Sequence, residues 1–189
     1  MHKGRLEAFS DGVLAIIITV MLLELHVPAG GRPADLSAAV PKLMLYALSF
    51  VFLGIYWVNH HHLFQATQRV TGVVLWANLH LLFWLSLIPF VTNWMGEHFD
   101  ALPVAAYGAV LFVSGVAYNI LARALVSAHG ADSVLAKAIG SDVKGVASVI
   151  IYGVGIAVAA FRPTVAFCLY VVVALIWFVP DRRIESLLH

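Results

Sequence analysis

Six apolar runs divide this sequence, and most of its charged residues lie outside them. A helix that crosses the hydrocarbon core of a bilayer needs about 20 predominantly apolar residues. Charged residues make up 11% of the chain, whereas a soluble domain carries roughly 25%. The pattern therefore predicts an all-α integral membrane protein whose surroundings are membrane lipid. No basic cluster indicates a nucleic-acid partner.

The six transmembrane helices are expected at about 8–25, 41–62, 73–94, 104–126, 146–161 and 165–179. Pro41 is suited to the first turn of the second helix, and Pro89 is expected to kink the last turns of the third. No linker is long enough to hold a soluble domain, so residues 1–189 are predicted to form a single transmembrane domain.

Lysine and arginine are distributed unevenly between the two sets of loops. With the N-terminus cytoplasmic, that side holds eight basic residues and the other side holds Arg32, Lys42 and Arg162. Cytoplasmic loops of membrane proteins carry an excess of Lys and Arg. The distribution predicts that both termini are cytoplasmic, which agrees with an even number of spans.

The first apolar run carries one narrow stripe of side chains. On a helix, Thr19, Val20 and Leu23 fall within about 60° of Ile16. Asp11 falls roughly 140° from Ile16 and should face the neighbouring helices. We therefore expect one side of this helix to face a pore while its polar N-terminal part is held by the rest of the protomer.

Polar residues in membrane helices are costly and usually have a role. Ser10 and Asp11 need hydrogen-bond donors at their depth, whereas Arg5 can extend to the interface. Donors are available at one end of the second and third runs. A polar network is predicted there from Asn59, His60, His61, His62, Trp76, Asn78 and His80.

The three consecutive histidines do not form a standard zinc motif. Adjacent helical residues point about 100° apart, so the three cannot bind one ion together. Structural hydrogen bonding is the favoured role, with pH sensing and metal binding as alternatives. No HExxH or GxSxG motif is present, the single cysteine forms no intramolecular disulfide, and neither enzymatic activity nor a cofactor is expected.

Residues 5–11, RLEAFSD, read as RxxxFSD. This motif resembles the signature of the transmembrane protein 175 family, which contains prokaryotic and endolysosomal potassium channels. The resemblance covers the whole chain: FSD lies in the first of six spans, an Asn-His cluster ends the second, and polar residues come early in the third. It implies that Arg5, Phe9, Ser10 and Asp11 form a structural motif.

The resemblance also implies that the first helix lines a pore, with Ile16 as the constriction and Thr19 and Leu23 completing the lining. Animal members carry two six-span repeats and dimerise, so a chain with one set is expected to be a homotetramer. The location implied is the cell membrane of a prokaryote.

The channel interpretation gives a physical mechanism. A ring of Ile16 side chains would make a cation shed part of its hydration shell, which favours potassium modestly over sodium. The TVGYG filter of other potassium channels is absent. The alternatives are a proton-coupled secondary transporter that uses Asp11 and the histidine cluster, and a membrane enzyme or non-conducting scaffold.

Overall fold

The computed structural model describes residues 3–28, 30–130, 133, 136 and 142–178, and the helices in these residues are the only regular secondary structure. Their bounds are α1 Lys3–Leu23, α2 Pro33–Gln65, α3 Gly72–Leu85, α4 Ile88–Glu97, α5 Ala101–His129, α7 Val143–Ala159 and α8 Pro163–Phe178. The prediction of an all-helical chain is confirmed for this part of the molecule.

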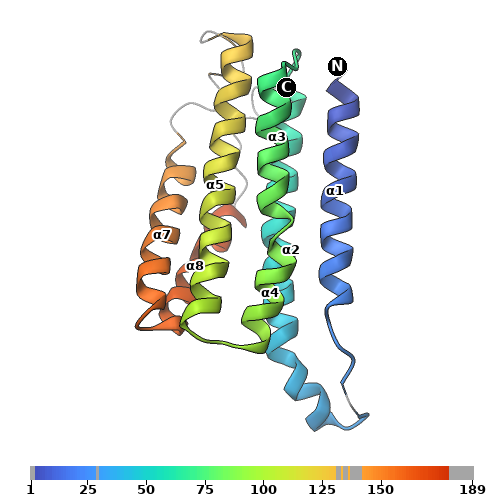
Figure 1. Cartoon of the computed structure of the whole chain (residues 1–189), viewed down its shortest axis with the longest axis vertical. Helices are drawn as coiled ribbons and strands as arrows, with labels where there is room; N and C mark the ends of the chain where they lie inside the picture. Colours follow the sequence, from blue (N-terminus) through green and yellow to red (C-terminus); the bar gives the residue numbers. More distant parts are fainter. Residues whose placement is uncertain (1–2, 29, 131–132, 134–135, 137–141, 179–189) are drawn as a thin grey trace.

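The helices run up and down along one long axis (Figure 1). Four spans are long and apolar enough to cross a membrane: α1, α2, α3 with α4, and α5. The helices α7 and α8 are apolar but shorter, with 17 and 16 residues. Counting α3 and α4 as one, the described residues form six helices, which agrees with the six apolar runs.

The second helix begins earlier than predicted. Pro33 is its first residue, and the Asp35 carboxylate accepts a hydrogen bond of 3.0 Å from the backbone N–H of Arg32. Pro41 lies inside α2, so its assignment to the first turn was wrong. Either proline could occupy the first turn of a helix. Only at Pro33 does a nearby carboxylate cap the N–H of the preceding residue.

The third span is broken where only a kink was expected. α3 ends at Leu85, Ser86 and Leu87 form a turn, and Pro89 is the second residue of α4. A proline ring clashes with the carbonyl four residues earlier and offers no N–H to it. For Pro89 that carbonyl belongs to Leu85, which is where α3 stops.

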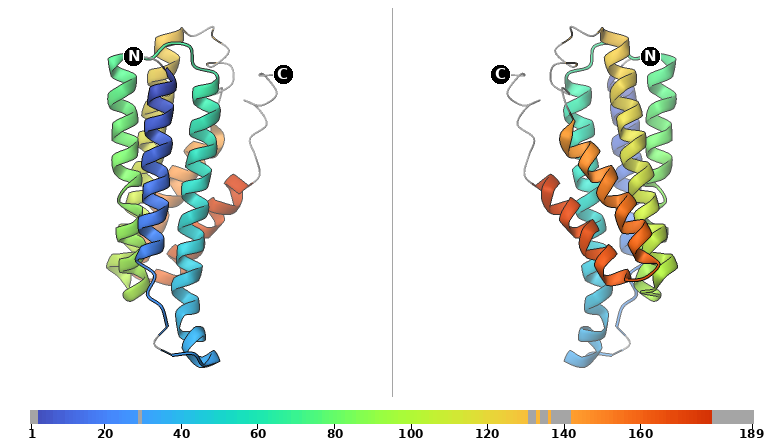
Figure 2. Two further views of the ribbon diagram at one scale, coloured as in Figure 1. Left: turned by 90° about the vertical axis from the view of Figure 1, so that its right-hand side faces the viewer. Right: turned by 90° about the vertical axis from the view of Figure 1, so that its left-hand side faces the viewer.

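α5 lies at the centre of the packing and contacts α3, α4, α7 and α8. α1 lies on the other side of the bundle, where it contacts α2, α3 and α4 (Figure 2). Between α5, α7 and α8 the ring of Tyr170 fits against Gly108 and Gly155, and a Cβ atom on either glycine would overlap it. These small residues allow close helix packing, so α1 joins an already packed set of helices by one face only.

Candidate pore-lining helix and its polar anchor

The face of α1 that packs on the protein recurs every three or four residues. It consists of Leu6, Ser10, Leu14, Ile17 and Met21, all of them buried. This spacing places all five side chains on one side of a helix. α2, α3 and α4 cover this face.

The predicted stripe lies on the opposite, uncovered side of α1. Ile16 is 62% exposed and Leu23 81% exposed, and Thr19 and Val20 are also exposed. The Thr19 hydroxyl donates to the Ile16 carbonyl at 2.9 Å, so its proton is used within the helix and its oxygen lone pairs remain available. Because these side chains are not in the core, helix packing within one chain does not explain them.

A groove runs along one edge of this uncovered face, between α1 and α4. It has a volume of about 350 Å³, and its lining includes Ile16, Val20 and Phe90. At its end the Asn93 amide donates to the Glu24 carboxylate at 3.1 Å. The stripe therefore borders a hollow that the single chain leaves unfilled.

A chain of buried hydrogen bonds holds the N-terminal half of α1. His60 Nε2 bonds Asn78 Oδ1 at 2.8 Å, the Asn78 amide donates to Ser10 Oγ at 2.9 Å, and the Ser10 hydroxyl donates to the Leu6 carbonyl at 2.9 Å. His60, Asn78 and Ser10 are each no more than 2% exposed. The Leu6 carbonyl can only accept, so the Ser10 hydroxyl donates to it and accepts from the Asn78 amide N–H. The Asn78 oxygen is then the acceptor of the last bond, so His60 Nε2 carries a proton. Three helices are thereby joined by side chains of the predicted network.

Asp11 has a different partner, which sequence reasoning missed. The Trp57 indole N–H of α2 donates to Asp11 Oδ1 at 3.0 Å, and the Trp57 ring stacks on His61. Trp57 lies three residues before His60, on a neighbouring part of the same helix face. The three-residue spacing between Trp57 and His60 was the one indication of this contact in the sequence. It did not distinguish Trp57 from the other tryptophans among the five in the chain.

Several predicted members lie outside this network. The Asn59 amide donates to the Ile55 carbonyl of its own helix at 2.8 Å, Trp76 is 75% exposed, and His80 accepts from Trp84 on its own helix. His62 Nδ1 is buried and has no hydrogen-bond partner among the described residues. Among the described residues these side chains do not join the Ser10–Asn78–His60 chain, because neighbouring positions on a helix face different sides.

Arg5 and Phe9, the other two members of the predicted structural motif, lie on the exposed side of α1. Both are exposed, and Arg5 makes no hydrogen bond or ion pair within the described part of the chain. On the helical wheel both lie within about 20° of Ile16. They therefore extend the uncovered face of α1 toward the N-terminus.

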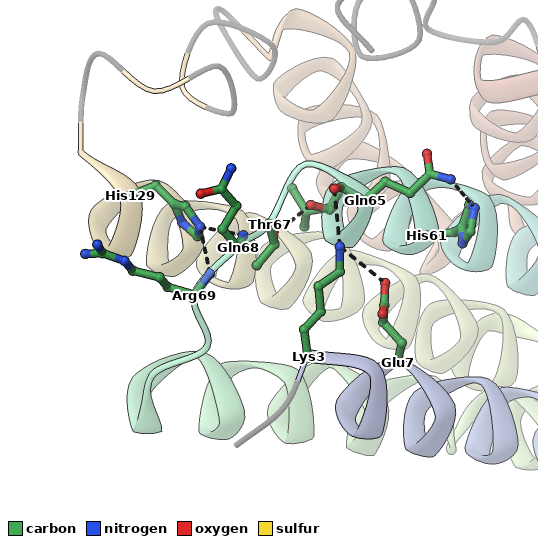
Figure 3. Close-up of polar contacts among 9 residues, drawn as sticks. Lys3, Glu7, His61, Gln65, Thr67, Gln68, Arg69 and His129 are labelled. Atoms are coloured by element: carbon green, nitrogen blue, oxygen red, sulfur yellow. Dashed lines mark hydrogen bonds and ion pairs between the residues drawn. The ribbon is translucent and has the colours of Figure 1, made fainter. Parts of the chain in front are cut away.

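The N-terminal end of the bundle is fastened by two further groups (Figure 3). The Lys3 ammonium donates to the Gln65 carbonyl at 3.3 Å and lies 4.0 Å from the Glu7 carboxylate. His129 Nδ1 bonds the Leu125 carbonyl at 2.8 Å, and its Nε2 accepts the backbone N–H groups of two residues in the α2–α3 loop. Because Nε2 accepts, the ring proton that bonds the Leu125 carbonyl is on Nδ1.

No group of three or more His, Cys, Asp or Glu side chains in the described residues is arranged to bind a metal ion. The site is therefore built from an apolar exposed stripe and a hydrogen-bonded anchor. Such a site has no evident nucleophile or metal centre and is suited to ion conduction or to association with another chain.

Comparison with known proteins agrees with this arrangement. Residues 5–89 match the family described as "Endosomal/lysosomal potassium channel TMEM175". A potassium channel of Chryseobacterium sp. (strain P1-3) is 54% identical over 187 residues, covering 98% of this chain and 97% of the relative. A potassium channel of Chamaesiphon minutus is 30% identical over 171 residues, covering 85% of this chain and 83% of the relative.

The fold is similar to a solved structure. The crystal structure of a lysosomal potassium-selective channel TMEM175 homolog from Chamaesiphon minutus superimposes with a TM-score of 0.79 and 25% identity, and the match covers 94% of this chain and 96% of that one. The protein is thus a multi-pass membrane protein and not an enzyme. The chain belongs to the TMEM175 family of potassium channels.

Proposed function

We propose that the protein is a homotetrameric potassium channel of a prokaryotic cell membrane, with one α1 helix from each protomer lining a central pore. The main observation is the uncovered stripe of Ile16, Thr19 and Leu23 on a helix whose other face is anchored. The relatives from Chryseobacterium sp. and Chamaesiphon minutus, both named as potassium channels, support the choice of ion.

One helix cannot enclose a path for an ion, so the pore requires several copies. Closed rotational symmetry is the usual arrangement of identical subunits, and four α1 helices would surround a narrow axis. The stripe would then face the axis, and the groove beside Ile16 and Val20 would receive side chains of the adjacent protomer.

Ile16 forms the constriction in this proposal. Four branched aliphatic side chains narrow the path until a cation loses part of its hydration shell, and an apolar ring of this kind also gates by dewetting. Potassium is dehydrated at lower cost than sodium, so the ring favours it modestly. Thr19 oxygens, whose protons are already bonded to Ile16 carbonyls, face the ion beyond the ring, and Val20 and Leu23 complete the lining.

The anchor has the supporting role. The Ser10–Asn78–His60 chain and the Asp11–Trp57 bond fix α1 against α2 and α3 without entering the pore. The geometry gives less support to a proton-coupled carrier. Asp11 bonds an indole and His60 an amide, so within the described residues no hydrogen bond connects that carboxylate to an imidazole.

Replacing Ile16 with asparagine tests the constriction. We expect a higher single-channel conductance and a potassium-to-sodium permeability ratio closer to one, because the amide replaces lost hydration oxygens. Leu22→Asn is the matched control, since Leu22 is 52% exposed on the same helix but away from the stripe. An unchanged ratio and conductance for Ile16→Asn would exclude Ile16 as the constriction.

The oligomer is tested separately by the mass of the purified protein in detergent. A mass of four chains agrees with the proposal, whereas a monomer leaves no means of enclosing a pore. Currents that reverse near the potassium potential identify a channel. A saturable, proton-linked flux would instead identify a carrier.

A further inference from the structure

A second groove lies between α5 and α7, on the side of the bundle away from α1 (Figure 1). It has a volume of about 280 Å³, which is close to the lower end of the range for ligand sites in proteins, about 300–1,000 Å³. Among the described residues it shares no lining residue with the groove beside Ile16, so it is not part of the proposed pore.

Most of the wall of this groove consists of aliphatic side chains. α5 contributes Val116 and Ile120, and α7 contributes Val146, Val149 and Ile150. Ile120, Val146 and Ile150 are 44%, 56% and 60% exposed. Lipid tails are as apolar as such side chains, so in a membrane protein this surface is suited to contact with lipid. A groove between two rows of aliphatic side chains fits an acyl chain, which is flexible and apolar.

Arg123 lines one end of the groove and is exposed. α5 has 29 residues, so it is about 43 Å long at 1.5 Å per residue, whereas the hydrocarbon core of a bilayer is about 30 Å thick. A helix centred in the core therefore extends about 6–7 Å beyond it at each end. Arg123 precedes the last residue, His129, by six residues, or about 9 Å. Its backbone then lies just inside the hydrocarbon, and its long side chain reaches the level of the lipid phosphates.

The groove becomes less polar from Arg123 inward. Asn119 lies one turn deeper, about 6 Å along the helix axis, and it also lines the groove. Its amide donates one hydrogen to the Gly115 carbonyl at 3.2 Å, and an amide group carries two. Val116 lies a further turn inward. Charge, amide and apolar surface therefore follow one another in the order of the phosphate, the glycerol ester and the acyl chain of a phospholipid.

We propose that this groove binds one anionic phospholipid per chain, with the phosphate against Arg123, an ester oxygen at the Asn119 amide and an acyl chain between α5 and α7. Arginine binds phosphate through two parallel N–H···O bonds, and a charge at the edge of the hydrocarbon is costly unless it is paired. A lipid with a net negative charge is favoured, because the choline cation of phosphatidylcholine offsets its phosphate. The inference is independent of the proposed pore, since α5 and α7 take no part in lining it.

The test is native mass spectrometry of the purified protein, released from detergent micelles that contain phosphatidylglycerol or phosphatidylcholine with the same acyl chains. The measured quantity is the apparent affinity for the first lipid bound per chain. We expect the wild type to prefer phosphatidylglycerol by about fivefold, and Arg123→Gln to reduce this preference to less than about twofold. Arg123→Lys keeps the charge without the planar fork and should retain more of the preference than Arg123→Gln. Arg69→Gln is the matched control, because Arg69 is exposed at the same end of the bundle but outside the groove.

Filling the groove tests the acyl chain separately. Ile150→Trp places a larger side chain on the exposed wall and should weaken the binding of both lipids by about threefold or more. The preference for phosphatidylglycerol should remain, because Arg123 is still present. Leu175→Trp is the control, since Leu175 on α8 is 63% exposed, close to the 60% of Ile150, but lies outside the groove. Thermal unfolding verifies that each variant is folded.

Three results overturn the proposal. The first is an equal preference for phosphatidylglycerol in the wild type and in Arg123→Gln, and the second is an equal loss of preference in Arg69→Gln. The third is unchanged binding of both lipids by Ile150→Trp, which is also the result expected if a second copy of this chain covers the groove.

Discussion

Replacing Asn78 with leucine removes the central member of the hydrogen-bond chain that holds α1. His60 Nε2–H then has no acceptor, although the side chain is only 2% exposed. Ser10 loses the bond it accepts but still donates to the Leu6 carbonyl. The substitution therefore leaves the His60 donor buried without a partner, whereas Ser10 keeps one of its two hydrogen bonds.

The magnitude follows from this asymmetry. A buried donor without a partner costs about 1–3 kcal/mol, and a neutral hydrogen bond contributes a net of about 1 kcal/mol. Hydrogen bonds between membrane helices average only about 0.6 kcal/mol, with a maximum near 1.7, since the unfolded state in a membrane also finds partners. We expect Asn78→Leu to lower the free energy of unfolding by about 2–3 kcal/mol.

A double-mutant cycle with His60→Phe isolates the interaction. The His60 ring stacks on Phe64 with centroids 4.5 Å apart, so phenylalanine keeps this contact and removes the donor. Replacing both partners of a buried bond with apolar groups is nearly neutral. The double variant should therefore be more stable than the sum of the single changes by about 1 kcal/mol.

The assay is unfolding by a denaturing detergent, followed by tryptophan fluorescence at fixed protein concentration, because oligomer stability depends on concentration. Ser114→Ala is the control, since Ser114 Oγ is buried and has no hydrogen-bond partner within the described part of the chain, so its removal should cost little. If the two changes are additive within about 0.3 kcal/mol, the His60–Asn78 bond adds no stability and the reasoning about that bond is refuted.

Three other substitutions test separate contacts. Gly108→Ala places a Cβ against the Tyr170 ring and should destabilise by about 1–3 kcal/mol, with partial recovery in combination with Tyr170→Phe; thermal unfolding measures both, and equal stability of Gly108→Ala and wild type would contradict the packing. Trp57→Phe removes the donor to Asp11 and should cost about 0.5–1.5 kcal/mol in the same assay, against no loss if that bond is incidental. His129→Phe removes the acceptor of two exposed loop N–H groups; water replaces it, so stability should fall by less than about 1 kcal/mol, while hydrogen exchange at these two amides speeds up, and unchanged exchange would show that the loop is held otherwise.

The six helices were predictable because membrane-spanning helices need long apolar runs, whatever they pack against. Helix ends depend on finer features. Pro33 and Pro41 both suit a first turn, and the choice between them was made by the Asp35 cap and not by apolarity. The helix breaks before Pro89 because proline has no N–H and because its ring clashes with the Leu85 carbonyl. From the sequence only a kink was expected there.

The candidate site was predictable to the extent that it depends on one helix. The positions of Ile16, Thr19 and Leu23 follow from the period of α1 alone, and their exposure fits the expected uncovered face. The partners of Ser10 and Asp11 depend on how three helices are rotated relative to one another. Among several polar candidates at a similar depth, only that rotation selects Asn78 and Trp57.

The rotation of α1 about its own axis is the property that the polar anchor controls. Lipid tails are as apolar as leucine, so apolar side chains alone give little reason for one face of α1 to prefer the protein over the membrane. The hydrogen bonds that Ser10 and Asp11 accept are directional and lie on adjacent residues. A turn of α1 by one residue, about 100°, would break both bonds and move Ile17 to the place of Ile16. Two hydrogen-bonded side chains near one end of the helix therefore determine which aliphatic residues a neighbouring copy, or an ion, would meet two turns away.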